Sequence, residues 1–177
     1  MHILQLTPYY VPAYSFGGVV SSVEGMSKSL IARGHQVTVL TTDALDPQHR
    51  IDGRYDEVID GVRIVRVPNR FSSLRKYANM STPVDIKNKA QEMLADVDLL
   101  HCHEFRTVEN LWVTKIAKER GVPIVLSPHG TMTHQTGRSS LKSLWDRFIS
   151  PSVAKRIDAV IALTQQEMQD CREIWER

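Results

Sequence analysis

Residues 2–34, HILQLTPYYVPAYSFGGVVSSVEGMSKSLIARG, decide the fold. The first five of these residues have the apolar character of a short buried strand, a loop of prolines and tyrosines follows, and Gly17-Gly18 open a helix that ends near Arg33. A strand, a glycine-bearing loop and a helix form half of a nucleotide-binding βαβ unit. Glycine lets a ligand approach the backbone, and the first N–H groups of a helix attract an anion, most often a phosphate. The alternative is a glycine pair that only lets the chain turn.

Length and composition indicate a globular domain. The 177 residues suffice for one domain with a full core or for part of a larger protein. The net charge of +2 gives no electrostatic argument for nucleic acid, so we expect none as a partner. Cys102 and Cys171 lie far apart and are expected to be buried and reduced, which fits a cytosolic protein. No apolar run has the length of a membrane span or a signal peptide.

Strands and helices are expected to alternate along almost the whole chain. Asp60-Gly61 is a tight-turn signal, and it predicts a hairpin whose second arm joins the main sheet. Buried strands are expected at residues 2–6, 36–41, 62–67, 98–103, 124–127 and 159–163. The fold class predicted from this alternation is α/β: one three-layer, Rossmann-like domain over residues 1–177, with a mostly parallel sheet.

More specific predictions can be made for three segments outside these strands. Residues 69–80 are polar and basic and are predicted to form a mobile loop. Thr82-Pro83 is predicted to start a helix, because it pairs a capping hydroxyl with a proline at the first helical position. Thr164 and Glu167 have capping-box spacing and predict a final helix.

Residues 138–156 combine an apolar stripe with basic residues, and two interpretations are open. The segment could rest on an anionic membrane surface, or it could be a core-facing helix with a solvated basic face. The stripe consists of Leu141, Leu144, Trp145 and Phe148, and the basic residues are Arg138, Lys142, Arg147, Lys155 and Arg156.

Unusual polar residues follow the predicted strands at their carboxyl ends, where α/β sheets bind ligands. Gly17-Gly18 lie beyond the first strand, His103-Glu104 end the strand at 98–103, and His129-Gly130 follow the strand at 124–127. The functional interpretation of His129-Gly130 is a histidine held over a ligand, with the glycine leaving room for a backbone contact. The alternative is a simple turn.

Other chemistries find little support. His101 and His103 point to one face of a strand and could begin a zinc site, but no third ligand has suitable spacing, so no metal is expected. The chain has no G-x-S-x-G element, no Ser-His-Asp order and no P-loop.

Taken together, these pieces resemble the N-terminal domain of a group 1 (family 4) glycosyltransferase of the two-domain GT-B type. The resemblance spans essentially the whole chain, and the order and spacing of its elements are more specific than any one of them. They are LTPYY at 6–10 with Gly17-Gly18, LIARGHQVTVLT at 30–41, DGV at 60–62, DLLHCH at 98–103, SPHGT at 127–131 and DAVIALT at 158–164.

The resemblance implies retaining transfer of a sugar, hexosyltransferase-like, from a nucleotide-sugar donor to a glycan, lipid-linked or small-molecule acceptor in glycan biosynthesis. It implies no cofactor and no metal. His129 would lie beside the donor sugar and His103 near the cleft, both as catalytic candidates, while Gly17 and Gly18 would approach the donor diphosphate. The candidates for sugar and acceptor binding are Gly130, Tyr9, Tyr10, Glu104 and Arg106.

One departure from the family pattern bears on activity. The family's second domain carries two glutamates separated by seven residues, and no two glutamates here have that spacing. We therefore expect the acceptor-side domain alone, with the C-terminal donor-binding domain absent and the fragment inactive by itself. The alternatives are a sugar-nucleotide epimerase of the same architecture and a non-catalytic binding module. The expected location is cytoplasmic, with peripheral contact at the inner membrane face as an option.

Overall fold

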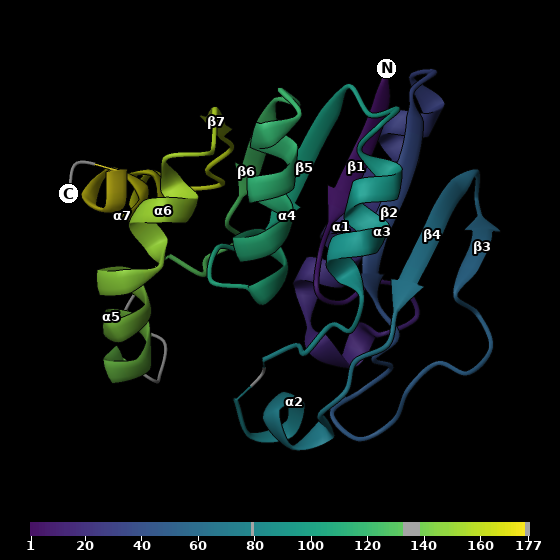
Figure 1. The fold of residues 1–177 in the computed structure, drawn as a ribbon, viewed down its shortest axis with the longest axis horizontal. Coiled ribbons are helices and arrows are strands. Elements are labelled where there is room, and N and C mark those ends of the chain that lie inside the picture. Colours follow the sequence, from purple (N-terminus) through teal and green to yellow (C-terminus); the bar gives the residue numbers. More distant parts are fainter. Residues whose placement is uncertain (79, 133–138, 176–177) are drawn as a thin grey trace.

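A seven-stranded sheet forms the centre of the molecule, with the order β3-β4-β2-β1-β5-β6-β7 (Figure 1). It is seen in a computed structural model that describes residues 1–78, 80–132 and 139–175. The parallel strands are β1 (His2–Leu6), β2 (Gln36–Thr42), β4 (Val62–Val67), β5 (Leu99–His103), β6 (Ile124–Ser127) and β7 (Ala159–Val160). Only β3 (Asp56–Ile59) runs antiparallel, beside β4 at the edge, as the Asp-Gly hairpin predicted.

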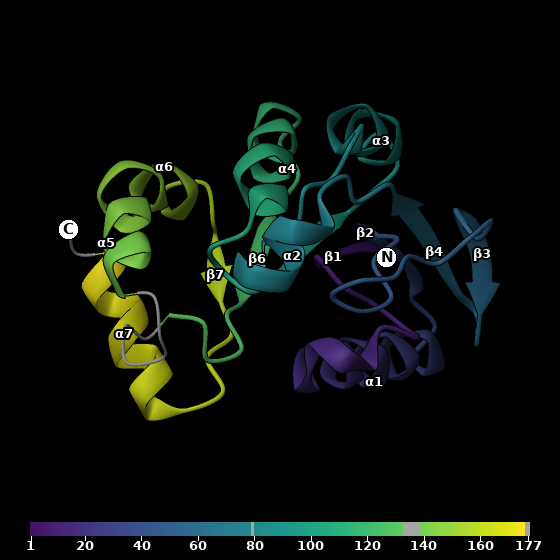
Figure 2. The ribbon, with the colours of Figure 1, turned by 90° about the horizontal axis from the view of Figure 1, so that it is seen from below.

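Helices cover both faces of this sheet. Figure 2 shows α1 on one face and α3 and α4 on the other. The helices are η1 (Tyr14–Phe16, a 3₁₀ turn), α1 (Gly18–Ala32), α2 (Ser72–Ala78), α3 (Ile86–Met93), α4 (Val108–Glu119), α5 (Ser139–Phe148), α6 (Ser150–Ala154) and α7 (Gln165–Trp175). The predicted Rossmann-like α/β fold with its mostly parallel sheet is confirmed.

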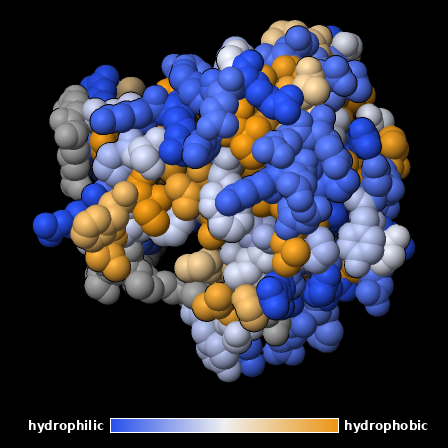
Figure 3. Space-filling view, in the orientation of Figure 1, coloured by the Kyte–Doolittle hydropathy of each residue, from blue (hydrophilic) through white to orange (hydrophobic). Residues whose placement is uncertain are grey.

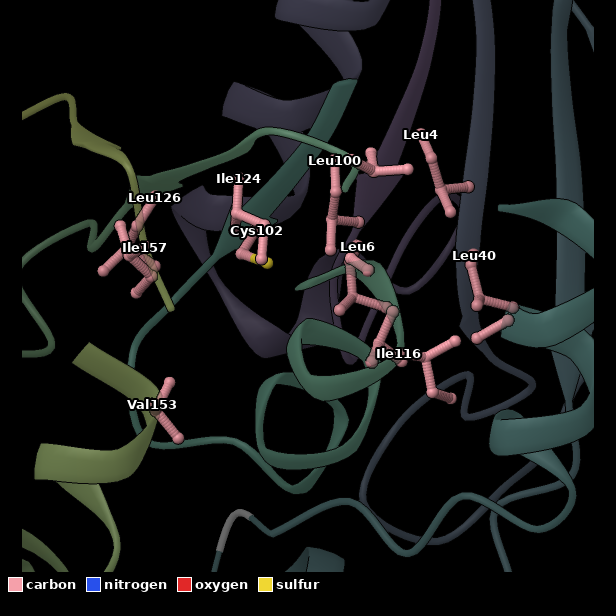
Figure 4. Close-up of a cluster of buried hydrophobic side chains, with 14 of the residues drawn as sticks. Leu4, Leu6, Leu40, Leu100, Cys102, Ile116, Ile124, Leu126, Val153 and Ile157 are labelled. Atoms are coloured by element: carbon pink, nitrogen blue, oxygen red, sulfur yellow. The ribbon is translucent and has the colours of Figure 1, made fainter. Parts of the chain in front are cut away.

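The hydrophobic core follows the alternation of side chains along each strand. On β1, Leu4 and Leu6 join Leu100 and Cys102 of β5 in the cluster beneath α3 and α4 (Figure 4). A second cluster, on the face covered by α1, contains Val20, Val23, Val37, Val39 and Ile64. Gln5, His101 and His103 alternate with the members of the first cluster and so face away from it, which places them on the α1 side of the sheet.

The β1–loop–α1 unit forms as predicted. The spacing of Val19, Val23, Met26 and Leu30 in the sequence predicts one buried apolar stripe on this helix. The buried residues of α1 are instead Val20, Val23 and Ser27, so the helix is rotated slightly from that orientation. The turn η1 brings the chain into the helix at Gly17, and Val19 and Leu30 pack only at the border of the core. Both cysteines are free and buried, as expected.

The segment from 69 to 85 differs most from the prediction. It is not an irregular loop, because Ser72–Ala78 form α2. The helix predicted to start at Thr82-Pro83 instead begins at Ile86. The Thr82 hydroxyl is engaged with Asn69 and with the Phe71 amide, and Pro83 pairs with Asn69 in an isolated bridge. These long-range bonds take the hydroxyl that would have capped the helix.

Two expectations near the C-terminal end are also wrong. The buried strand predicted at 159–163 has only two residues in β7, at the sheet edge, and Ile161 and Leu163 are exposed. The core-facing interpretation of the stripe on α5 fails, because Leu144 and Phe148 are exposed. The side chain of Leu141 lies outside the described part of the structure.

Candidate functional site

The carboxyl ends of β1, β5 and β6 meet at one edge of the sheet. These three strands are neighbours, with Leu6 paired to Cys102 and His103 paired to Ser127 in the register of the sheet. The loops that follow them therefore emerge side by side. They carry most of the residues that the sequence singled out.

Three side chains on this edge form one hydrogen-bonded chain. His103 on β5 lies between Gln5 on β1, whose Oε1 contacts its Nε2, and His129, whose Nε2 is 2.9 Å from its Nδ1. The His103 and His129 rings are stacked with their centroids 5.2 Å apart. The sequence predicted both histidines at this edge, and the structure brings them into direct contact.

The chain of bonds fixes where the protons lie. The carboxamide oxygen of Gln5 only accepts hydrogen bonds, so the His103 Nε2 must carry the proton. The His103 Nδ1 is then an acceptor and receives the Nε2–H of His129. It follows that the His129 Nδ1 has no proton and offers a lone pair. Gln5 was missed from the sequence, although a polar residue in an otherwise apolar strand was a usable signal.

All three histidines of this edge are held neutral. Burial lowers the pKa of His103 well below its usual range, with the neighbouring His101 and His129 adding to the effect. Burial likewise lowers the pKa of His101 to about 4, and it lowers the pKa of His129 despite the opposing charge of Glu167. At neutral pH these rings act as hydrogen-bonding groups and not as cations.

Three ring nitrogens of His101 and His103 are engaged within the protein. Within the described residues, no group of three or more His, Cys, Asp or Glu side chains is placed to hold a metal ion. The nitrogens have other partners: the His101 Nε2 is 2.8 Å from the Ser127 hydroxyl, and both nitrogens of His103 are engaged. A lone pair that is already in a hydrogen bond is not available to a metal.

The loop that carries His129 is held in an unusual conformation. His129 and Gly130 have φ angles of 54° and 76°, and the first of these is uncommon for a residue with a side chain. The Glu167 carboxylate secures the turn by accepting the Gly130 N–H and, at 2.7 Å, the Leu163 N–H. The Thr164 hydroxyl caps α7 as predicted by accepting the Glu167 N–H at 3.1 Å. The Glu167 side chain, however, supports the histidine loop instead of completing the capping box.

Gly17 and Gly18 lie at the N-terminus of α1. Gly17 has a φ of 102°, and it precedes the helix without any side-chain cap. A Cβ atom added at either glycine would meet no atom within 4 Å, so the space over this backbone is open. The helix α1 is 15 residues long, and its N-terminus has no side-chain cap and has open space above it. Such a helix N-terminus can receive an anion.

The four acceptor-side candidates fall into two groups. Tyr9 and Glu104 lie at the carboxyl edge, where burial raises the pKa of Glu104 to about 7 and leaves the Tyr9 hydroxyl without a partner in the described structure. Both tyrosines belong to the hydrophobic cluster under α1, and Tyr10 is distinguished from Tyr9 only in that its hydroxyl is not among the buried unpartnered groups of the described structure. The guanidinium of Arg106 is occupied by Asp146, at 2.7 and 2.8 Å, and by backbone carbonyls, so it supports the loop structurally.

Two further residues of this edge were missed from the sequence. Glu109 lies in the first turn of α4, and burial raises the pKa of its carboxyl group to about 7. Arg75 lies on α2, in the segment that was predicted to be a loop, and its side chain is buried. Neither position carried a motif, and their burial depends on contacts that are distant in the sequence.

A family model described as "Glycosyl transferase 4-like domain" matches residues 17–176. The chain belongs to this family. The matched residues include His103, His129, Gly17 and Gly18, together with β5 and β6 of the carboxyl edge, and they begin after β1. This confirms the family that the sequence motifs suggested.

Among solved structures, the crystal structure of MurG from Acinetobacter baumannii is similar to this glycosyl transferase 4-like domain. The match has a TM-score of 0.52 at 15% sequence identity and covers 91% of this chain and 40% of the MurG chain. At that identity the similarity shows the fold alone. The chain spans less than half the length of MurG. No curated protein matches it.

Proposed function

We propose that this domain is the acceptor-side half of a retaining glycosyltransferase that uses a nucleotide-sugar donor. In the reaction, the bond between the anomeric carbon and the diphosphate oxygen breaks, and the anomeric carbon forms a bond to an acceptor oxygen. The acceptor hydroxyl passes its proton to the departing diphosphate, and the nucleoside diphosphate leaves. The observation that carries the proposal is the neutral His129 with its free Nδ1 lone pair, held at the carboxyl edge of a domain of this family.

Each group at the edge has a role in this proposal. The backbone at Gly17-Gly18 and the N-terminus of α1 receive the donor diphosphate. The His129 Nδ1 accepts a hydrogen bond from a hydroxyl of the donor sugar, and Gly130 gives that sugar room. His103 and Gln5 keep His129 in the tautomer that can accept. Tyr9 and Glu104 face the acceptor.

The energies favour a second domain as a partner in donor binding. A charge near a helix N-terminus is stabilised by about 0.3–1 kcal/mol, rising to about 2 kcal/mol when partly buried. Even micromolar binding needs about 8 kcal/mol. The α1 terminus can therefore orient a diphosphate but cannot retain a nucleotide sugar, so we expect negligible transfer by this chain alone.

The glycine pair offers a sharp test on the protein encoded by the whole gene. Gly18 lies in helical conformation with open space above it, so Gly18→Ala adds one methyl group without disturbing the fold. We expect this variant to keep its stability and to raise the KM for the donor at least tenfold, because the methyl group occupies the approach of the diphosphate. The assay follows label from UDP-glucose, UDP-N-acetylglucosamine or GDP-mannose into acceptors of a cell extract.

Gly25→Ala is the matched control, because Gly25 lies in the same helix and also has open space around it. It should leave the KM unchanged. NMR of the product should show the anomeric configuration of the donor, as retention requires. Equal KM values for the two variants would contradict the diphosphate site. An epimerised donor without transferred sugar would indicate the epimerase, and no turnover with any donor would indicate a binding module.

We also propose peripheral contact of this domain with an anionic membrane, on the cytoplasmic side. The exposed Leu144 and Phe148 lie on α5 beside the basic Arg147. Figure 3 shows hydrophobic surface on the side of the molecule where Figure 1 places α5. None of the described helices is long and apolar enough to span a bilayer. A surface contact of this kind would bring the enzyme to a lipid-linked acceptor.

A further inference from the structure

A buried arginine on α2 has no counter-charge in contact with it among the described residues. The side chain of Arg75 is 2% exposed, and none of its three guanidinium nitrogens has a hydrogen-bond partner in the described structure. It makes no ion pair within 4 Å with any described residue. Figure 1 places α2 below the carboxyl ends of the strands. The charge of Arg75 acts on the Tyr9 hydroxyl, so the guanidinium lies within electrostatic reach of that residue.

A buried cation without a partner is an expensive arrangement. A guanidinium cannot lose its proton in a protein, so it cannot escape the penalty by becoming neutral. Removing such an ion from water costs several kcal/mol unless a counter-charge or several hydrogen bonds compensate. An arginine held in this state has unused capacity to donate hydrogen bonds to an anionic oxygen acceptor.

The side chains near Arg75 carry oxygen atoms that can accept hydrogen bonds. The hydroxyl of Tyr9 is buried without a partner in the described structure, and neither carboxyl oxygen of the buried Glu109 makes a hydrogen bond of good geometry there, although Ser81 lies close enough to act on it. The charges of Glu109, Glu104 and Arg75 all act on the Tyr9 hydroxyl, so each of the three charged groups lies within electrostatic reach of it. The charge of Glu109 also acts on Glu104. Carboxyl groups in such a cluster accept hydrogen bonds from hydroxyl groups.

The cluster comes from four separate segments. Tyr9 follows β1, Glu104 follows β5, Glu109 begins α4, and Arg75 belongs to α2. The Tyr9 ring stacks on Phe16, with ring centroids 3.6 Å apart, and Phe16 directly precedes Gly17. The cluster is thus adjacent to the loop that we assign to the donor diphosphate, on the side where an acceptor would lie.

We propose that Arg75, Tyr9, Glu104 and Glu109 form a binding site for a carbohydrate that bears an anionic oxygen group, either a carboxylate or a phosphate. Arg75 holds the anionic group through its forked N–H donors, and the two glutamates and the tyrosine bind the hydroxyl groups of the sugar ring. The inference rests on the proposed function in one respect: it makes this carbohydrate the acceptor. Binding itself needs no transfer reaction.

Direct binding to the 177-residue chain tests the site. The probes are sodium glucuronate, glucose 6-phosphate, inorganic phosphate and neutral glucose, titrated while amide chemical shifts are followed by NMR. We expect glucuronate or glucose 6-phosphate to bind at least tenfold more tightly than glucose. The stronger of the two identifies the anionic group as a carboxylate or a phosphate. Glucose binding as tightly as both would overturn the proposal.

Variants of two arginines separate the site from general surface charge. Arg75→Gln should weaken binding of the preferred anionic sugar at least tenfold and leave glucose unaffected. Arg70→Gln is the matched control: Arg70 is exposed and lies five residues before Arg75, and its loss should change affinity less than twofold. Equal effects of the two substitutions would overturn the assignment to Arg75.

The wild-type chain supplies a measurement that does not depend on a variant folding. On binding of the anionic sugar, the amide signals of Arg75 and Glu109 should shift with one common dissociation constant. Saturable shifts confined to other regions would overturn the site. If the anionic sugar binds here but the whole protein transfers no sugar, the proposed function fails and the site remains. If the protein transfers sugar but the anionic sugars bind no more tightly than glucose, the site fails and the proposed function remains.

Discussion

Two arginines with little exposed side-chain surface, Arg106 and Arg75, differ in whether their guanidinium groups have hydrogen-bond partners. Arg106, at the end of β5, gives hydrogen bonds to both oxygens of Asp146 and to the carbonyls of Thr131 and Met132. Arg75, on α2, has no partner among the described residues. From the sequence alone, Arg106 was a candidate for acceptor binding and Arg75 lay in a predicted loop. The structure favours the opposite assignment.

The difference distinguishes residues that hold the fold in place from residues that we propose to bind a ligand. The region around Arg106 includes the His129 loop and Glu167, and its charged groups are used to hold backbone in place. Such a region is pre-organised before any ligand arrives. The region around Arg75 holds charged groups whose bonding capacity is unused. A protein keeps such groups buried, against their cost, where a ligand completes them.

The largest effect is expected from removing each arginine in turn. Arg106→Met should lower the free energy of unfolding by about 3–5 kcal/mol, because it takes the guanidinium away from the buried Asp146 carboxylate. Arg75→Met should be neutral or stabilising, because it replaces an unpaired buried charge with an apolar group of similar length. Urea unfolding of both variants measures the contrast.

Arg63→Met is the control for this comparison. Arg63 also pairs with an acid, Asp56, but both side chains are 53% exposed, so its loss should change stability by at most about 1 kcal/mol. A large destabilisation by Arg75→Met would show that Arg75 has a structural partner in the free protein. The distinction between the two regions would then be lost.

The second effect is a pH dependence in the Arg75 region. Burial raises the pKa of Glu109 from 4.5 to about 7 in the folded protein. The folded state therefore holds a proton that the unfolded state releases between these values, and stability falls as pH rises through this window. Glu109→Gln removes this loss, so wild type should lose up to about 3 kcal/mol relative to the variant between pH 4.5 and 7.

The buried histidines do not obscure this measurement. Their lowered pKa values make stability rise with pH up to about 6.5, but they are present in wild type and variant alike and cancel in the difference. Glu173→Gln, at an exposed position on α7, should leave the wild-type curve unchanged. A constant difference between wild type and Glu109→Gln across the window would mean that Glu109 is charged in the folded protein.

The sequence was sufficient for the elements whose signals are local. The apolar strand before Gly17, the Asp60-Gly61 turn and the threonine that caps α7 at Thr164 each depend on neighbouring residues, and each appears where it was expected. Parallel topology then followed from alternation. This topology also predicted that His103 and His129 lie at one edge, because the carboxyl ends of neighbouring parallel strands lie at the same edge of the sheet.

Long-range bonds account for what the sequence did not predict. Thr82 did not cap a helix, because it bonds to Asn69 and Phe71 across a turn. Glu167 had the spacing of a capping box, yet its carboxylate reaches Gly130, 37 residues away. Gln5 acts on His103, 98 residues away. No periodicity or spacing reports such contacts, so the supporting residues of the site were found only in the folded chain.

A smaller effect tests the pre-organised region. The bond from the His103 Nε2–H to Gln5 predicts that both His103 and His129 are protonated at Nε2, which ¹⁵N NMR of the imidazole rings reads directly. Gln5→Leu should cost about 1–2 kcal/mol, because it leaves that N–H buried without an acceptor. Thr41→Val is the control, since the buried Thr41 hydroxyl has no partner among the described residues. A proton on Nδ1 of His103 would reverse the chain of bonds and leave His129 a donor.

The smallest effect on stability is expected at the exposed apolar residues that flank the two regions. Phe148 on α5, beyond the Arg106 region, is 69% exposed, and Phe71 just before α2 is 49% exposed. Phe148→Ser should change the free energy of unfolding by less than about 0.5 kcal/mol, because little of its surface is buried by folding. It should nevertheless weaken sedimentation with phosphatidylglycerol vesicles, while Phe71→Ser should not if α5 alone makes the contact. If both substitutions weaken vesicle binding, the membrane lies along the edge shared by α5 and α2, and a lipid-linked acceptor would enter between the paired and the unpaired arginine.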